Sequence, residues 1–252
     1  MSLLPDFSGP ARMWGSPGGS GDRRLLCVSG LGGDVDEWAG VGPGLAVHGE
    51  AVAVEAAGAG LRTGDGPLRA GVTALEPLLA DTSRPCVLVG HSMGGVIGLL
   101  TATAQPDRLA GLILTSPFLP VGRGDRSAVA TAADYAHHRM LFARDVRSRR
   151  RARQARSAAG PGNRAAGLRA LARYGLRPAA FHAMADRVTC PVLLVHGGDD
   201  HYVPPAFARA AATRHPDWRL DVIAGAGHFP HRDNPADWLA RVDPWLRRLW
   251  TA

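Results

Sequence analysis

The sequence predicts an α/β domain with a mostly parallel, doubly wound sheet, and three observations lead to this prediction. Short apolar runs alternate with helical patterns along the 252 residues, as expected when strands are joined by right-handed helical crossovers. The pentapeptide GHSMG at residues 90–94 stands where one apolar run gives way to a helical pattern. Between residues 118 and 186, Ala- and Arg-rich helical patterns replace the strands, which predicts a helical cap inserted between the core segments 1–117 and 187–252.

Six strands of the sheet are expected in chain order, each a run of β-branched and aliphatic residues bounded by turn-forming residues. They fall at residues 25–29, 50–54, 86–90, 111–115, 191–196 and 219–223. At the start of this series, residues 11–14 and 23–26 flank a Gly- and Pro-rich turn, which predicts an antiparallel hairpin at the edge of the sheet. Loops at the carboxyl ends of parallel strands meet at one edge, so the reactive residues are expected there.

The composition is that of a single folded domain, with 46% hydrophobic and 20% charged residues. The first residues lack a basic segment followed by an apolar stretch, and no window approaches a membrane span, so we expect a cytoplasmic protein. Cys27, Cys86 and Cys190 are odd in number, and each stands at or beside an apolar run, which predicts buried free thiols. No zinc-ligand spacing is present, and we expect neither a metal nor a cofactor.

The basic residues are unusual in kind and in placement. All 29 are arginine, the net charge is +7, and residues 144–156 carry seven of them. Such a cluster suggests nucleic-acid or membrane binding, but without interleaved aromatic residues it is more typical of the solvated face of a cap helix. We therefore expect no nucleic-acid partner. Attraction of an anionic substrate or a phospholipid headgroup is the intermediate alternative.

The glycines around Ser92 indicate the chemistry of the pentapeptide. In a nucleophile elbow the turn is so tight that the serine takes a strained backbone conformation, and side chains at Gly90 or Gly94 would crowd it. The hydroxyl is thereby pushed clear of the backbone at the sheet edge. Ser92 is the predicted nucleophile, and it needs a histidine to take its proton and a carboxylate to hold that histidine in the right tautomer.

The last two predicted strands end in loops that offer these partners. The first of these loops bears glycines and carries Asp199 and Asp200, and either carboxylate could face the elbow. The second presents His228 after two glycines, with His231 three residues further on. The residues favour His228 as the base and leave the acid open between the two aspartates.

These segments, together with the glycine-rich loop after the first parallel strand, match the motifs of the α/β-hydrolases in order, and the chain resembles that family over nearly its whole length. The family's acid motif, His-Gly-x-x-Asp-x-x-Val-Pro, lies on residues 196–204 and implies Asp200 as the acid. Asp199 would then face solvent or cap the loop. The segment GAGHFP resembles the family's histidine loop, which implies His228 as the base and His231 as a surface or mouth residue.

The resemblance also implies an oxyanion hole. One backbone N–H comes from the residue after the nucleophile, here Met93, and another from the loop after the early strand, here Leu31. This chain has Ser29-Gly30 where many relatives have His-Gly. The glycines of the loop do not form Gly-x-Gly-x-x-Gly and no Walker lysine follows, which disfavours a phosphate-binding loop.

In the family a cap closes over the nucleophile and shapes the pocket for the acyl or alcohol group. Apolar residues of the predicted cap, and a tryptophan soon after the oxyanion loop, are therefore candidates for that pocket. The alternative for each is ordinary packing, because apolar residues at helical spacing usually belong to a core. The candidates are Trp38, Phe118, Leu119, Tyr135, Met140, Leu141 and Phe142.

The resemblance implies a serine hydrolase that cleaves a small-molecule acyl ester or thioester through an acyl-enzyme. Residues 90–95 and 112–117 are closest in sequence to the monoacylglycerol lipase and lysophospholipase branch. Three alternatives stay open: a thioesterase or cyclase of secondary metabolism, a C–C bond hydrolase, and a non-catalytic ligand-binding relative. Binding alone gives no reason for Ser, Asp and His at all three motif positions. Dehalogenases and epoxide hydrolases carry aspartate at the elbow and are disfavoured. The sequence is compatible with a homodimer.

Overall fold

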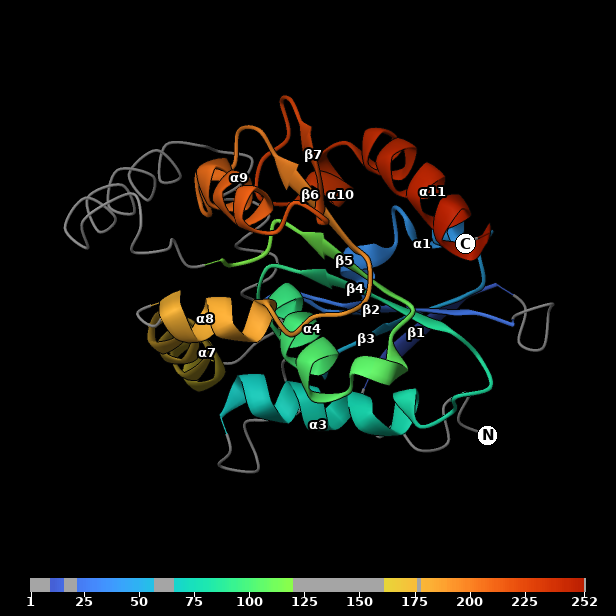
Figure 1. Cartoon of the computed structure of the whole chain (residues 1–252), viewed down its shortest axis with the longest axis horizontal. Helices are drawn as coiled ribbons and strands as arrows, with labels where there is room; N and C mark the ends of the chain where they lie inside the picture. The colour runs from blue at the N-terminus through green and yellow to red at the C-terminus, as the bar shows by residue number, and fades with distance from the viewer. Residues whose placement is uncertain (1–9, 16–21, 57–65, 120–160, 176–177, 252) are drawn as a thin grey trace.

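The computed structural model of the chain describes residues 10–15, 22–56, 66–119, 161–175 and 178–251 (Figure 1). Several predicted features lie outside these residues, and they stay predictions. They are the pocket candidates Tyr135, Met140, Leu141 and Phe142 and the arginine cluster at residues 144–156.

A seven-stranded sheet runs through the described chain in the order β1-β3-β2-β4-β5-β6-β7. Every neighbouring pair is parallel except β1 and β3, which are antiparallel. The prediction of a mostly parallel α/β sheet is confirmed. The strands are β1 Ala11–Trp14, β2 Arg24–Val28, β3 Glu50–Val54, β4 Cys86–His91, β5 Gly111–Thr115, β6 Val192–Gly197 and β7 Arg219–Ile223.

The predicted hairpin between residues 11–14 and 23–26 is wrong in its partner. β1 lies at the sheet edge and is antiparallel, as expected, but it pairs with β3, with Ala11 opposite Val54 and Trp14 opposite Ala51. β2 instead lies between β3 and β4. The reason is burial: β2 is buried along its whole length and β3 nearly so, whereas β1 is exposed or half-buried and suits an edge.

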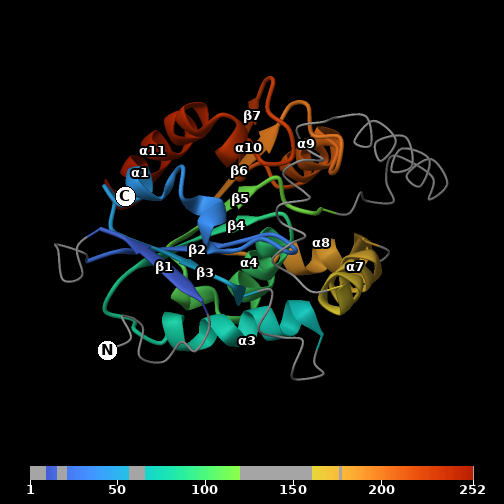
Figure 2. The same cartoon turned by 180° about the vertical axis from the view of Figure 1, so that it is seen from behind.

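Helices cover both faces of the sheet, which is why alternate residues of one strand are buried on opposite sides. Figure 1 shows α1 and α11 on one side and α3, α4, α7 and α8 on the other, and Figure 2 shows the same two layers from behind. On β2, Leu26 and Val28 join the core cluster of the α4 side, while Leu25 and Cys27 join that of the α11 side.

Seven of the helices in the described chain begin at a proline, which has no N–H to leave unpaired and fixes φ near a helical value. The helices are η1 Val35–Trp38, α1 Gly42–Leu45, α3 Pro67–Leu79, α4 Met93–Ala104, η2 Pro106–Arg108, α7 Pro161–Gly175, α8 Pro178–Ala185, α9 Pro205–Arg214, α10 Pro230–Asp233 and α11 Pro235–Thr251. Within the residues that the structure describes, no helix has both the length and the apolar character to cross a membrane.

The two described helices of the predicted cap pack against helices that cover one face of the sheet. α7 packs against α3, and α8 packs against α4. Leu171 of α7 and Phe181 of α8 are buried in the same hydrophobic cluster as Leu88 of β4. This part of the predicted cap therefore shares the hydrophobic core that also contains β4.

The three cysteines are free thiols, as predicted. Cys27 and Cys86 are buried, while Cys190 is only partly buried. Burial raises the pKa of Cys86 to about 12 and that of Cys190 to about 11. None of them is positioned as a reactive thiolate, because a nucleophilic cysteine needs its pKa lowered.

Candidate active site

The turn between β4 and α4 has the strained geometry that the sequence predicts. Ser92 lies at φ 51° and ψ −112°, and only one other non-glycine residue in the described chain, Ser116, has a positive φ. A conformation of this kind costs of order 1–3 kcal/mol and persists where the surrounding structure fixes it. Here the Ser92 N–H donates to the Thr115 carbonyl at 3.0 Å, which ties the elbow to the end of β5.

The flanking glycines are required because backbone approaches them closely. A Cβ at Gly90 would lie 2.5 Å from the Gly94 carbonyl oxygen. A Cβ at Gly94 would collide with the carbonyl oxygen of Val28 at the end of β2. These neighbours are backbone atoms that cannot rotate away. Glycine at position 90 therefore allows the tight turn, and glycine at position 94 allows the elbow to pack against the end of β2.

The structure brings Ser92, His228 and Asp200 together in one hydrogen-bonded chain. His228 Nε2 lies 3.1 Å from Ser92 Oγ, and His228 Nδ1 lies 2.8 Å from Asp200 Oδ2. All three residues are buried. A nucleophilic serine, a base and an orienting carboxylate stand in this relation in serine hydrolases of several unrelated folds.

Asp200 is held by more than the histidine. Its Oδ1 accepts the N–H groups of Tyr202 and Val203, each at 2.8 Å. Its Oδ2 lies 3.2 Å from His196 Nε2 as well as close to His228. Burial opposes ionisation, but His228 and His196 outweigh it and hold the pKa of Asp200 well below its ordinary value. Asp199, the alternative acid, is exposed to solvent.

Both predicted oxyanion donors belong to backbone next to Ser92. Leu31 lies in a tight turn closed by the Gly33 N–H and the Gly30 carbonyl at 3.0 Å. This turn contacts the elbow, since a Cβ at Gly30 would be 3.2 Å from Ser92 Cβ. Met93 is the first residue of α4, so its N–H has no intrahelical acceptor and lies at the positive end of the helix dipole.

Ser29, which replaces the family's histidine before this turn, has a structural role that the sequence does not reveal. Its hydroxyl donates to the Asp34 carbonyl at 2.7 Å and accepts the Trp38 Nε1–H at 3.1 Å. Ser29 therefore fastens to η1 the turn at residues 30–33, which carries the predicted oxyanion donor Leu31 and is named the oxyanion turn.

Two of the predicted pocket residues have no surface open to a substrate. Trp38 is fully buried, stacks on His231 at 4.6 Å between ring centroids, and packs beside Trp238. Leu119 is also fully buried in the core. Both residues pack in the core instead of lining a pocket, so the prediction that Trp38 and Leu119 contact the substrate is corrected. Phe118 is partly buried, and its N–H lies 3.4 Å from the Ser92 carbonyl oxygen.

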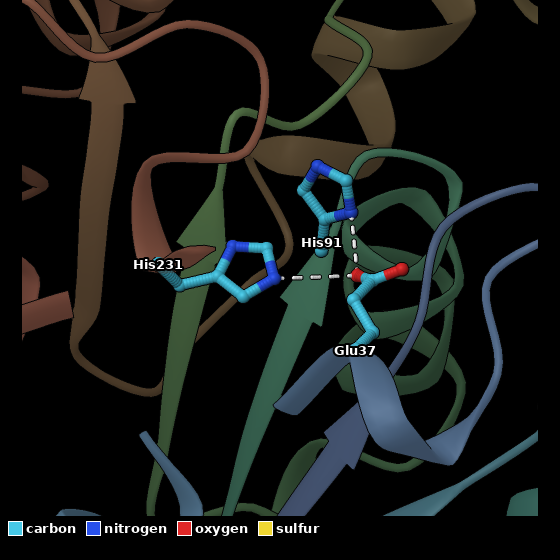
Figure 3. Close-up of side chains that lie close together, drawn as sticks. All are labelled: Glu37, His91 and His231. Atoms are coloured by element: carbon cyan, nitrogen blue, oxygen red, sulfur yellow. Dashed lines mark ion pairs between the residues drawn. The ribbon is translucent and has the colours of Figure 1, made fainter. Parts of the chain in front are cut away.

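His231 is a second correction, because it is fully buried rather than at the surface or the mouth. It lies on α10, three residues after His228, and points inward toward Glu37 of η1 (Figure 3). Glu37 is equally buried, and the sequence did not single it out. Oxygen and nitrogen atoms of Glu37, His91 and His231 lie within 4.8 Å of one another, close enough to hold a metal ion.

The fold and this arrangement of serine, histidine and aspartate at the carboxyl edge of the sheet define an α/β-hydrolase. A family model described as Serine aminopeptidase, S33 matches residues 24–235, and the chain belongs to that family. Relatives of the chain include hydrolases that act on ester bonds.

Two relatives and one solved structure illustrate the similarity. The pimeloyl-[acyl-carrier protein] methyl ester esterase of Aromatoleum aromaticum is 31% identical over 68% of this chain and 78% of its own length. The monoglyceride lipase of Mus musculus is 28% identical over 64% of this chain and 58% of its own length. A carboxylesterase structure from Nitrososphaera gargenis superposes with a TM-score of 0.71 at 17% identity, covering 96% of this chain and 95% of that one, which shows the common fold.

Proposed function

We propose that the chain hydrolyses a small carboxylic ester through an acyl-enzyme formed on Ser92. The observation that carries the proposal is the continuous path from Ser92 Oγ to His228 Nε2 at 3.1 Å and from His228 Nδ1 to Asp200 at 2.8 Å. Binding alone would not need a strained serine joined to a buried histidine and carboxylate.

The reaction follows from the positions of these groups. Ser92 Oγ attacks the ester carbonyl while His228 Nε2 takes its proton, and Asp200 keeps the other ring nitrogen protonated. The N–H groups of Leu31 and Met93 bind the oxyanion, each contributing about 3 kcal/mol of transition-state stabilisation. The alcohol leaves with the proton from His228, which then activates water to release the acid and restore Ser92.

The proposal includes a cap, a substrate class and a location. The proposed cap is residues 118–186. Gly167 of α7 supports this, because it lies so close to the predicted oxyanion donor Leu31 that a Cβ there would collide with the Leu31 side chain. The relatives named above act on a methyl ester and on monoglycerides, which favours an oxyester over a thioester. The proposed location is the cytoplasm, whose reducing environment accords with the free thiols of Cys27 and Cys86.

A substrate panel tests this function. We expect kcat/KM for p-nitrophenyl esters, methyl esters or monoacylglycerols to exceed that for acyl thioesters of the same chain length by at least about tenfold. Varying the acyl length from two to sixteen carbons would map the acyl pocket. A thioester preference of the same size would overturn the oxyester assignment, and no turnover of any acyl compound by the folded protein would overturn hydrolysis itself.

The pH dependence should report the burial of His228. Burial lowers the pKa of His228 below its ordinary 6.5, although Asp200 acts in the opposite direction. We expect kcat/KM to rise with pH to a plateau, with its midpoint below 6.5. The unfolded chain binds this proton more readily than the folded protein, so the free energy of unfolding should fall as the pH drops below 6.5. A kinetic midpoint clearly above that value would contradict the prediction.

A further inference from the structure

Three buried polar side chains form a cluster beside His228, the proposed base. Glu37 comes from η1, His91 from the end of β4 and His231 from α10, and each is at most 2% exposed. Figure 3 shows both histidines directed at one oxygen of Glu37. The contacts are 2.7 Å from His91 Nδ1 to Glu37 Oε1 and 3.5 Å from His231 Nε2 to the same oxygen. The steps proposed above use none of these three side chains.

The contacts of His91 fix the orientation of its ring. His91 Nε2 is 2.9 Å from the backbone carbonyl oxygen of His228, which can only accept a hydrogen bond, so Nε2 carries a proton. Nδ1 lies 2.7 Å from Glu37 Oε1, so the other side of the ring faces the buried carboxylate. This contact does not have hydrogen-bond geometry, so Glu37 acts on the ring through its charge and its close packing.

Glu37 is ionised in this cluster although it is buried. Burial opposes its ionisation, but His91 and His231 outweigh burial and hold the pKa of Glu37 well below its ordinary value. A buried carboxylate is retained only where partners compensate for its lost hydration. Glu37 therefore restrains the His91 ring on one side, while the His228 carbonyl restrains it on the other.

The cluster joins the three segments that must keep their places during the reaction. His91 precedes Ser92 in the elbow, and Gly30 of the oxyanion turn lies against the same ring. His91 also contacts His228 ring to ring, with centroids 5.0 Å apart. His231 fixes the far end of the histidine loop by stacking on Trp38.

We propose that Glu37 is a positioning residue that acts through His91 to hold the backbone of His228, and so the Nε2 of its ring, at reacting distance from Ser92. This inference rests on the proposed function. A displacement of about 1 Å at reacting atoms can cost a hundredfold in rate, so a small loss of restraint should be measurable.

The same three ligand atoms could instead surround a cation, since two histidines and a carboxylate suit zinc or iron. The 2.7 Å contact between His91 Nδ1 and Glu37 Oε1 argues against a cation between these atoms. Zinc at about 2.0–2.1 Å from each ligand holds neighbouring ligand atoms roughly 3.3 Å apart in a tetrahedral site. Bound metal is therefore an outcome of the test that would overturn the proposal.

The test compares Glu37→Gln with Glu50→Gln. Glu50 is a matched control because its carboxylate is also mostly buried in an ion pair, with Arg24 at 2.9 Å, but it lies at the amino end of β3, away from Ser92. Each protein is treated with a fluorophosphonate at pH 8, and intact mass gives both the rate constant and the final extent of labelling. A loss of folded protein lowers the extent, whereas a displaced His228 lowers the rate constant.

We expect Glu37→Gln to reduce the labelling rate constant about tenfold or more with full final labelling, and Glu50→Gln to stay within about twofold. His91→Gln keeps an N–H near the position of Nε2 and should be slowed less than His91→Leu. Adding Glu37→Gln to His91→Gln should have little further effect, because Glu37 acts through the imidazole.

Each remaining outcome has one meaning. If the wild type is labelled and Glu37→Gln reacts at the same rate, positioning by Glu37 is wrong while the proposed function stands. If Glu37→Gln does not fold, the two His91 variants decide, and equal rates for Gln and Leu overturn the proposal. Stoichiometric metal in the wild type, with activity lost on chelation, would also overturn it. A folded wild type that is not labelled contradicts the proposed function instead.

Discussion

Replacing Ser92 by alanine should reduce ester hydrolysis by about 10⁴-fold or more and abolish fluorophosphonate labelling, because no other group can form the acyl-enzyme. The fold does not depend on the Ser92 hydroxyl, because the elbow is held by hydrogen bonds of the Ser92 N–H and carbonyl. Its thermal unfolding midpoint should therefore stay close to that of the wild type. The measurements are kcat/KM with a p-nitrophenyl ester, intact mass and calorimetry.

Ser116→Ala is the matched control. Ser116 is buried like Ser92, has a positive φ of 41°, and lies just after β5 beside the same edge of the sheet. Within the described residues its hydroxyl has no hydrogen-bond partner, so we expect activity within a few-fold of the wild type. Equal losses in both variants would show that strain or packing, and not nucleophilicity, explains the effect of Ser92→Ala. Retention of a tenth of the activity by Ser92→Ala would disprove the acyl-enzyme on this serine.

The central strands were predictable because their apolar runs are buried on both faces and are bounded by turn-forming residues. The strand expected at 111–115 is observed at those residues, and that at 191–196 is shifted by one. The partner of β1 was not predictable from local pattern. A short turn favours a hairpin locally, whereas the pairing with β3 depends on which strand edge remains open after the parallel strands have assembled.

The site divides in the same way. The elbow is recognisable from local sequence, since its motif is five consecutive residues and Gly90 is required by backbone of the same turn, at Gly94 and Gly95. The cluster of Glu37, His91 and His231 is not, because three ordinary-looking residues far apart in sequence become neighbours only after folding. His231 resembled a surface residue because the turn of α10 that directs it inward follows from the tertiary fold.

The choice between Asp199 and Asp200 combines both kinds of information and leads to a sharp prediction. Adjacent aspartates in one loop are chemically alike, and the family motif favours the second of them. The structure gives a physical reason for the difference: Asp200 is buried against His228 and His196, whereas Asp199 is exposed. The two residues therefore provide a matched pair of isosteric substitutions.

We expect Asp200→Asn to lower kcat/KM by about 10⁴-fold, because an amide does not hold His228 in the tautomer that leaves Nε2 free to accept the Ser92 proton. The free energy of unfolding should also fall by about 1–3 kcal/mol, since Asp200 Oδ1 accepts two backbone N–H groups and the amide weakens this network. Asp199→Asn should change kcat/KM by less than about twofold, because an exposed carboxylate without a buried partner adds little. Steady-state kinetics and urea unfolding of both variants measure these effects. The reverse result, with Asp199→Asn inactive and Asp200→Asn active, would mean that the acid reaches His228 from the other aspartate and that the hydrogen bond at 2.8 Å is not the one used in catalysis.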